Sequence, residues 1–322
     1  MDTEFEKEAV VVTPAPLAAM WRRYVAFLAD WIILSLGGYI VGMLLFDPLV
    51  RLGLWTRVIG VVIATVYFGI FDSGWGGASS PGKKMLGIRV VDDGGRVLGP
   101  IRSVVRAALI CAPFMLTNLF PMEGERPWGA LALNGLIGGW MSATLYLLAF
   151  NRGTRQGLHD LATRSFVVHG RATRQGLATY TFWQPHIVIA VAFVALSVPA
   201  GMAGLPMYMH FAPGSVSPVT STTTVPDTGP VQVLGSRLTW KLKTAHDKNP
   251  PECLTAWFHL AGTGVDDESV ARSLAMRMVA HYHCRVVTNL TVRMQYGFDL
   301  GFSSGTRFRD FVIDEADLTR SP

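Results

Sequence analysis

Long runs of apolar residues recur along this chain, and their spacing predicts a series of membrane-spanning helices. A helix needs about 20 mostly apolar residues to cross the roughly 30 Å hydrocarbon core of a bilayer. The runs that approach or exceed this length are Tyr24–Phe46, Leu52–Phe71, Val104–Phe120, Trp128–Phe150 and His186–Met209. Arg57 in the second run and Arg106 in the third must lie near the membrane surface or find a partner, because a charge in hydrocarbon is costly. The pattern predicts an α-helical polytopic membrane protein with about five transmembrane helices.

Composition and charge agree with this fold and suggest its orientation. Hydrophobic residues make up 50% of the chain and charged residues 16%, which argues against an ordinary soluble protein. The net charge of +5 does not indicate nucleic-acid binding, because the basic residues cluster beside the apolar runs. Positively charged loops stay in the cytoplasm, so residues 1–21 are expected to form a cytoplasmic tail and the C-terminus to lie outside. We expect a multi-pass protein of the bacterial inner (plasma) membrane without a cleaved signal peptide.

The character of the chain changes around the fifth apolar run. Residues 171–209 are expected to form an interfacial segment and the fifth transmembrane helix, and residues 210–231, rich in Ser, Thr and Pro, an extended linker. Residues 232–322 are mixed in charge and predict a small α+β extracytoplasmic domain. Its expected strands and its one helix are Arg237–Lys243, Leu254–Leu260, Leu290–Phe302, Phe308–Ile313 and the helix Asp266–His283.

Two cysteines of this C-terminal module suggest a covalent cross-link. Cys253 and Cys284 both belong to it, whereas Cys111 lies within an apolar run. In an oxidising compartment a disulfide would help a module with a small core, so we favour a Cys253–Cys284 bridge. The alternative is a zinc or copper site made by these cysteines and the nearby histidines His259, His281 and His283.

Asp30 is the most unusual residue of the apolar runs. A carboxylate at that depth costs several kcal/mol unless it is paired or hydrated, so it is a candidate functional residue. Arg23 is one heptad away, roughly 10 Å along a helix axis, which is too far for a direct pair. Arg106 enters the third run from the same side as Asp30 enters the first. We therefore predict an Asp30–Arg106 pair, formed directly or through a water molecule.

Small residues predict close helix packing at two places. Gly38 and Gly42 in the first run, and Gly135 and Gly139 in the fourth, are each four residues apart. This spacing lets the backbones of neighbouring membrane helices approach closely. Glycine is also common in membrane helices without such a role, so each pair has a neutral interpretation as well.

Three motifs, in order along the chain, resemble the RDD family of membrane proteins. They are Arg23-x-x-Ala26-x-x-x-Asp30, the Gly-rich loop from Gly76 to Arg106, and the stretch RQGLHDLATRSFVV from Arg155 to Val168. The resemblance implies a four-helix membrane domain over residues 22–170. It places Asp160 at the second aspartate position of the family, and it implies transport as a suggested activity.

The Gly-rich loop invites a second interpretation. Its stretch from Gly77 to Lys84 nearly matches the phosphate-binding pattern G-x-x-x-x-G-K-[ST], but Lys84 replaces the hydroxyl residue that holds magnesium. A β-hairpin is the better prediction, with a strand over Met85–Val91 and a turn at Asp93-Gly94-Gly95. Lys83 and Lys84 would then contact anionic lipid headgroups.

The His159-Asp160 pair resembles the doublet of metal-dependent phosphohydrolases, but no further ligands accompany it. We favour a structural role, in which Asp160 accepts hydrogen bonds from arginines or from a helix N-terminus. The chain shows no convincing nucleophile–base set, metal motif or phosphate cradle. We therefore expect neither an enzyme nor a bound cofactor or metal.

Two functional hypotheses remain. In the first, the protein transports an ion or small solute through a site that uses Asp30, with Arg23, Arg106 and Asp160 as motif residues. In the second, it is a membrane-anchored binding or assembly protein whose extracytoplasmic module recognises a protein partner, and Asp30 belongs to a structural ion pair. Expected partners are the lipid bilayer and the solute or protein just named, with a second copy of the chain as a further candidate and no nucleic acid.

Overall fold

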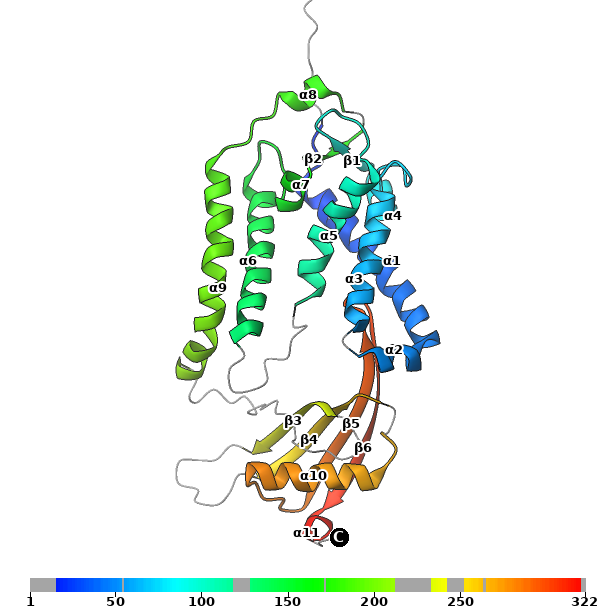
Figure 1. Ribbon diagram of the computed structural model, residues 1–322, viewed down its shortest axis with the longest axis vertical. Helices are drawn as coiled ribbons and strands as arrows, with labels where there is room; N and C mark the ends of the chain where they lie inside the picture. Colours follow the sequence, from blue (N-terminus) through cyan, green and yellow to red (C-terminus); the bar gives the residue numbers. More distant parts are fainter. Residues whose placement is uncertain are drawn as a thin grey trace, which may run out of the picture. The chain divides into compact units, whose positions relative to one another are not determined.

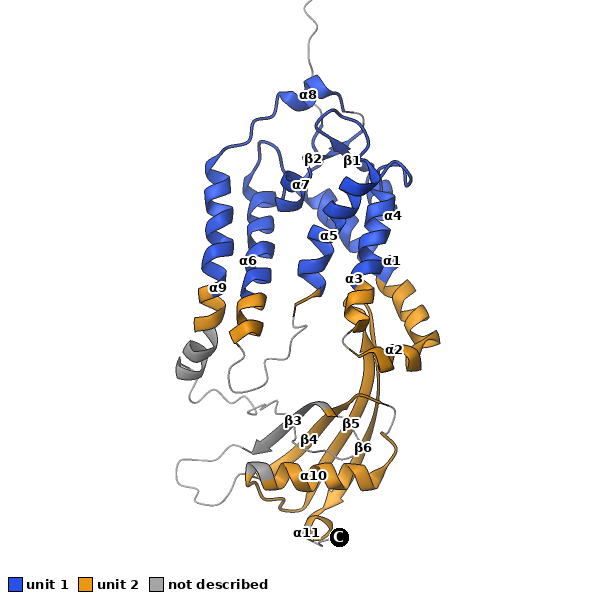
Figure 2. Ribbon diagram, viewed as in Figure 1, with its two compact units in different colours: residues 1–34, 61–115, 135–198 blue, residues 35–60, 116–134, 199–322 orange. Residues whose placement is uncertain are grey.

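The computed structural model describes the chain from residue 16 to residue 319 with several gaps. The described ranges are 16–53, 55–117, 128–170, 172–211, 233–241, 252–262 and 265–319. The chain divides into two units (Figure 2). Unit 1 comprises residues 1–34, 61–115 and 135–198, and unit 2 comprises residues 35–60, 116–134 and 199–322. The predicted tail over 1–21 and linker over 210–231 fall mostly outside the described residues.

Each predicted apolar run corresponds to a helix (Figure 1). These helices are α1 (Met20–Leu44), α3 (Trp55–Phe71), α5 (Pro100–Met115), α6 (Trp128–Phe150) and α9 (Pro185–Phe211). Within the described residues, α1, α6 and α9 are long and apolar enough to cross a membrane. The short helix α2 (Phe46–Leu52) adds a fourth span if it is counted with α3, to which it is bent by 112°. The predicted number of five spans therefore stays a prediction.

The exposed surface of these helices explains why we treat them as membrane helices. Ile32 on α1 is 66% exposed and Val188 on α9 is 70% exposed. Large apolar side chains on the outside of a helix are costly in water but stable against lipid tails. Helix α5 differs, because its 16 residues span only about 24 Å and it buries Arg106.

Unit 1 also contains short elements outside the long helices. Strands β1 (Ile88–Asp92) and β2 (Ser165–His169) pair antiparallel, with Val90 opposite Val167. The predicted turn after β1 forms, because the Asp92 amide donates to the Arg96 carbonyl at 2.8 Å. The predicted hairpin is only partly correct, since the main partner of β1 comes from the distant β2. The remaining short helices are α4 (Pro81–Met85), α7 (Leu158–Ala162) and α8 (Arg174–Ala178).

The predicted glycine contact in the fourth run is confirmed within unit 1. Helices α6 and α9 run side by side (Figure 1). A Cβ atom built on Gly135 would lie 2.7 Å from the Ser197 carbonyl oxygen, and one on Gly139 would lie 2.1 Å from Ser197 Oγ. Only glycine lets these two backbones approach so closely.

The C-terminal part of unit 2 is the predicted α+β module. Its sheet has the order β3-β4-β5-β6, antiparallel except for the parallel β4–β5 pair. The elements are β3 (Val233–Lys241), β4 (Glu252–Leu260), α10 (Glu268–Tyr282), β5 (Asn289–Asp299), β6 (Ser304–Asp314) and α11 (Glu315–Thr319). A parallel pair needs a crossover, which α10 supplies between β4 and β5. Alternate β5 residues, from Leu290 to Phe298, are buried.

The predicted disulfide is confirmed. Cys253 at the start of β4 is bonded to Cys284, two residues after α10, with a Cα–Cα distance of 5.8 Å. With both thiols in the bridge, neither is available to the alternative metal site. No group of three or more His, Cys, Asp or Glu residues suited to a metal occurs in the described part of the chain.

The glycine pair of the first run has an unexpected neighbour. Within unit 2, a Cβ on Gly38 would lie 2.3 Å from the Phe302 ring and one on Gly42 2.2 Å from the Phe298 ring. A Cβ on Gly60 of α3 would likewise lie 1.8 Å from the Leu300 carbonyl oxygen. These glycines therefore receive the tip of the β5–β6 hairpin, and the predicted helix–helix contact is wrong for Gly38 and Gly42.

Polar contacts secure the same hairpin tip. Ser35 Oγ donates to the Phe302 carbonyl at 2.7 Å, and Thr56 Oγ1 donates to the Asp299 carbonyl at 2.9 Å. Arg57 pairs with the Asp299 carboxylate at 2.6 Å. Arg57 thus finds the partner that its position in an apolar run requires.

Candidate functional site

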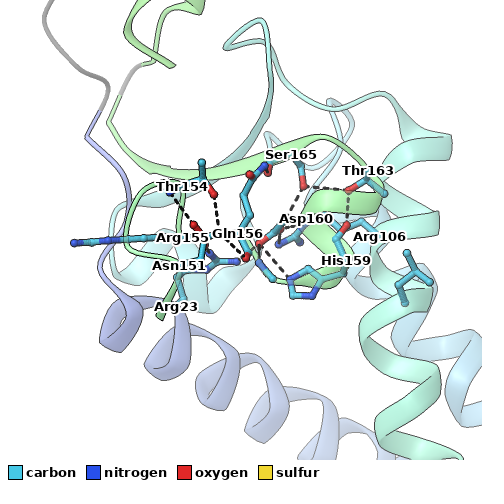
Figure 3. A network of polar contacts seen from close by, with 12 residues as sticks. Arg23, Arg106, Asn151, Thr154, Arg155, Gln156, His159, Asp160, Thr163 and Ser165 are labelled. Carbon is cyan, nitrogen blue, oxygen red and sulfur yellow. Dashed lines mark hydrogen bonds and ion pairs between the residues drawn. The ribbon is translucent and has the colours of Figure 1, made fainter. Parts of the chain in front are cut away.

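Asp160 is the centre of a buried ion network in unit 1 (Figure 3). Its carboxylate accepts hydrogen bonds from Arg106 Nε at 2.9 Å and from Arg106 Nη2 at 2.8 Å, and it also pairs with Arg23. The Gly157 amide at the start of α7 donates to its other oxygen at 3.2 Å. Asp160 is completely buried. The predicted hydrogen bonds to Asp160 from arginines and from a helix N-terminus are confirmed.

Asp72 extends the network toward the Gly-rich loop. Its carboxylate accepts from Arg106 Nη1 at 2.8 Å and from Lys83 Nζ at 2.6 Å. Asp72 is 1% exposed. Asp72 does not stand out in the sequence because it lies one position after the apolar run that ends at Phe71. A carboxylate at the end of a span, followed by a basic loop, was the available signal.

Asp30 has partners other than the predicted one. It is completely buried and accepts from Tyr67 Oη at 3.0 Å, from the Gly82 amide at 2.8 Å and from Ser80 Oγ. The predicted direct Asp30–Arg106 pair is therefore wrong, since the Arg106 guanidinium is bonded to Asp72 and Asp160. Three donors satisfy the Asp30 carboxylate without a direct ion pair.

Gly82 shows how tightly the Gly-rich loop is packed against α1. A Cβ atom at this position would lie 2.2 Å from the Ala26 carbonyl oxygen and 3.0 Å from the Asp30 carboxylate. Only glycine lets the amide reach Asp30, so the family-like motif Ala26-x-x-x-Asp30 and the Gly-rich loop form one contact. Asp30 fixes the loop that carries Lys83.

The two loop lysines have different surroundings. The Lys83 side chain is only 12% exposed and bonds both Asp72 oxygens. The predicted headgroup contact is wrong for Lys83, because a buried carboxylate holds it inside the unit. Lys84 is exposed and its Nζ lies 5.7 Å from the Phe71 ring, so its predicted contact with lipid headgroups stays a prediction.

Neutral polar residues support the segment that carries Asp160 (Figure 3). Asn151 Nδ2 donates to Thr154 Oγ1 at 2.7 Å, and Gln156 Nε2 donates to the Ser165 carbonyl at 2.9 Å. These bonds join the end of α6 to β2. Hydrogen bonds among these polar residues therefore hold the segment that carries Asp160.

Burial and nearby charges shift the pKa values in the loops of this network. Burial lowers the pKa of His159 to about 3, so its imidazole is neutral near pH 7. Burial alone would raise the pKa of Asp160, but the charges of Arg23 and Arg106 hold it well below its ordinary value. Burial also lowers the pKa of Lys83, although Asp72 opposes this shift. Lys83 is therefore easier to deprotonate than an exposed lysine.

A cavity of about 320 Å³ borders the network in unit 1. The residues that line it include the basic side chains Arg23, Lys83 and Arg106, together with His159. Apolar side chains of α1, α5 and α6 form most of its remaining wall. Asp30, Asp72 and Asp160 are not among the described residues that line it. The cavity therefore exposes the cations of the network and leaves the carboxylates behind them.

Comparison with known proteins finds one family that resembles the part of the chain that contains this network. No curated protein and no solved structure matches the chain. The model of the RDD family matches residues 17–164. This range contains Asp30, Asp72 and Asp160. It also contains Arg23, Lys83 and Arg106, the cations that pair with Asp72 and Asp160. This part of the chain, residues 17–164, is similar to the RDD family of membrane proteins, and we call it the RDD region.

Proposed function

We propose that the RDD region binds an ion or small solute and moves it across the membrane, and that the protonation of Lys83 controls binding. The observation that carries this proposal is the position of Lys83. It lines the cavity and bonds a carboxylate, Asp72, that it shares with Arg106. A titratable group between a cavity and a buried ion network can couple a proton to a solute.

The charges explain how such coupling works. Asp72 and Asp160 share three cations, Arg23, Lys83 and Arg106, so this cluster has one excess positive charge while Lys83 is protonated. When Lys83 releases its proton to water in the cavity, that excess disappears, and Asp72 keeps its bond to Arg106. Asp30 acts on Lys83 from farther away. The affinity for a charged solute therefore changes with one protonation step.

Asp30 has a positioning role in this proposal. It does not line the cavity, and its three donors hold it against the loop of Lys83. This differs from the expectation that the transport site itself uses Asp30. Loss of its charge should loosen the loop and thereby disturb Lys83 indirectly.

Proton flux in vesicles tests the proposal. We would reconstitute the purified chain in liposomes with trapped pyranine and impose gradients of sodium, potassium or chloride. Wild type should show proton movement linked to one of these gradients, and Lys83→Gln should abolish it. Lys84→Gln is the matched control, because Lys84 is exposed on the same short helix. Unchanged flux in a folded Lys83→Gln protein would contradict the coupling role.

A second function is favoured by the C-terminal module. Phe308 and Val312 on β6 are 57% and 64% exposed. Strand β6 is at the edge of the sheet, where a peptide or a second chain can add a strand. A membrane-anchored assembly protein would use this surface for a protein partner, and the RDD region as its anchor. Absence of any proton-linked flux in wild-type vesicles, together with a partner captured through β6, would favour this function over transport.

A further inference from the structure

The walls of the cavity in unit 1 and its charged residues have different chemistry. Phe27 of α1, Leu109 and Phe114 of α5, and Trp140 and Leu148 of α6 are among the apolar residues that line it. Arg23, Lys83 and Arg106 line it as well and are joined to one another through Asp72 and Asp160. The cations therefore lie together, while the rest of the wall is mostly hydrocarbon.

We propose that this cavity binds an anionic amphiphile, with the acid group at Arg23, Lys83 and Arg106 and a single hydrocarbon chain along the apolar wall. The proposal rests on the proposed function through the site that both share, and it names the class of solute. It can be tested by binding alone, without any measurement of transport.

The donors of the three cations support an anionic head. Arg106 uses three N–H groups on Asp72 and Asp160, and an arginine has five. Arg23 bonds Asp160 and the Arg155 carbonyl, and within the described part of the chain Lys83 hydrogen-bonds to Asp72 alone. Each cation thus keeps donors for a further acceptor. Thr144 also lines the cavity, and its buried hydroxyl has no hydrogen-bond partner within the described residues.

The apolar wall and the volume restrict the ligand further. A hydrated inorganic ion would gain nothing from the rings of Phe27, Phe114 and Trp140, whereas a hydrocarbon chain gains roughly 0.8 kcal/mol per buried methylene group. The volume of about 320 Å³ is at the lower end of the range of ligand pockets, roughly 300–1,000 Å³. It suits one chain with a small acid group, such as a medium-chain carboxylate, better than a two-chain phospholipid.

Fluorescence quenching by a brominated carboxylate tests this inference. We would titrate 11-bromoundecanoate into the full chain in nanodiscs of zwitterionic lipid and follow tryptophan emission. Trp140 lines the cavity, so saturable quenching should occur in wild type and be weaker in Trp140→Phe, where Trp31 still contacts the lining residue Phe114. The methyl ester of the same compound is the control for charge. Equal quenching by acid and ester would overturn the proposal, because it would identify a groove filled by any lipid chain.

Two pairs of variants test separately how the ligand's acid group and its hydrocarbon part are bound. Lys83→Gln should weaken binding of the acid by about tenfold or more, the scale of one charge-assisted hydrogen bond, while Lys84→Gln should not change it. Leu148→Phe fills the cavity and should weaken binding of the acid, whereas Leu136→Phe on the same helix lies outside the cavity and should not. Unchanged binding in folded Leu148→Phe and Lys83→Gln proteins would also overturn the proposal.

Binding and transport can fail separately. Saturable binding of the acid without proton-linked flux would support the cavity assignment and contradict the transport proposal. Flux driven by an inorganic ion, with no saturable binding of the acid, would support transport and contradict the amphiphile as its solute.

Discussion

The buried histidine beside Asp160 should make the stability of the RDD region depend on pH. His159 is 5% exposed, and its Nε2 lies 3.4 Å from an Asp160 oxygen. Its pKa falls from the ordinary 6.5 to about 3 because burial penalises the imidazolium. In the unfolded chain the same side chain binds a proton near pH 6.5. Between these two values the unfolded state binds more protons than the folded state, so stability decreases as the pH falls.

The loss of stability on acidification follows from how far the pKa of His159 is lowered. Each pH unit inside this window changes the free energy of unfolding by at most about 1.4 kcal/mol. Acidification from pH 6.5 to pH 4 should therefore cost about 3 kcal/mol through His159 alone. For domains of 150–250 residues that corresponds to a fall in Tm of roughly 6–12 °C. Asp160 adds only a small loss in the same direction near pH 4, because its pKa is lowered in the folded state and its carboxyl begins to bind a proton only in the unfolded chain, near the ordinary value.

Thermal unfolding in nanodiscs at pH 7, 5.5 and 4 measures this dependence. His159→Gln removes the titration, so its Tm should change much less with pH than that of wild type, whatever its Tm at pH 7. His169→Gln is the matched control, because His169 is exposed at the end of β2 and should keep the wild-type slope. The reasoning would be refuted by a His159→Gln protein whose Tm falls with acid as steeply as that of wild type.

The remaining predictions concern unit 2. Gly37→Ala in α1 should be neutral or stabilising by up to about 1 kcal/mol, because nothing lies within 4 Å of its Cβ position. Gly38→Ala should lower the Tm, because its Cβ would lie 2.3 Å from the hairpin's aromatic ring, and equal Tm values for the two variants would contradict this contact. Removing the disulfide by Cys253→Ser with Cys284→Ser should cost roughly 3–4 kcal/mol of module stability. Both thiols should resist alkylation in intact cells until reductant is added, and labelling without reductant would contradict an extracytoplasmic module.

Sequence alone determined the helices and most of the module, because both rest on local patterns. Long apolar runs can only be stable as helices in lipid, where every backbone polar group must be bonded within its own segment. The strands β4, β5 and β6 and helix α10 lie close to their predicted positions, because alternation and helix periodicity are local properties. The disulfide was also accessible, since two cysteines of one small module had few alternatives.

Partner choice was decided only by tertiary structure. The depth of Asp30 in its helix was readable, but the direction in which its side chain points relative to other helices was not. In the structure Arg106 pairs with Asp160 and Asp72, and Asp30 accepts a hydrogen bond from the Gly82 amide. A sequence shows that a buried charge needs a partner, whereas the crossing of helices and loops decides which group reaches it.

The glycine pairs make the same distinction. Both pairs have the same spacing, and each indicates a place where something approaches the helix backbone closely. Gly135 receives the backbone of α9, whereas Gly38 receives an aromatic ring from the tip of the β5–β6 hairpin. Spacing within one helix records the need for a small residue. The identity of the neighbour depends on segments distant in sequence, and only the folded chain brings them together.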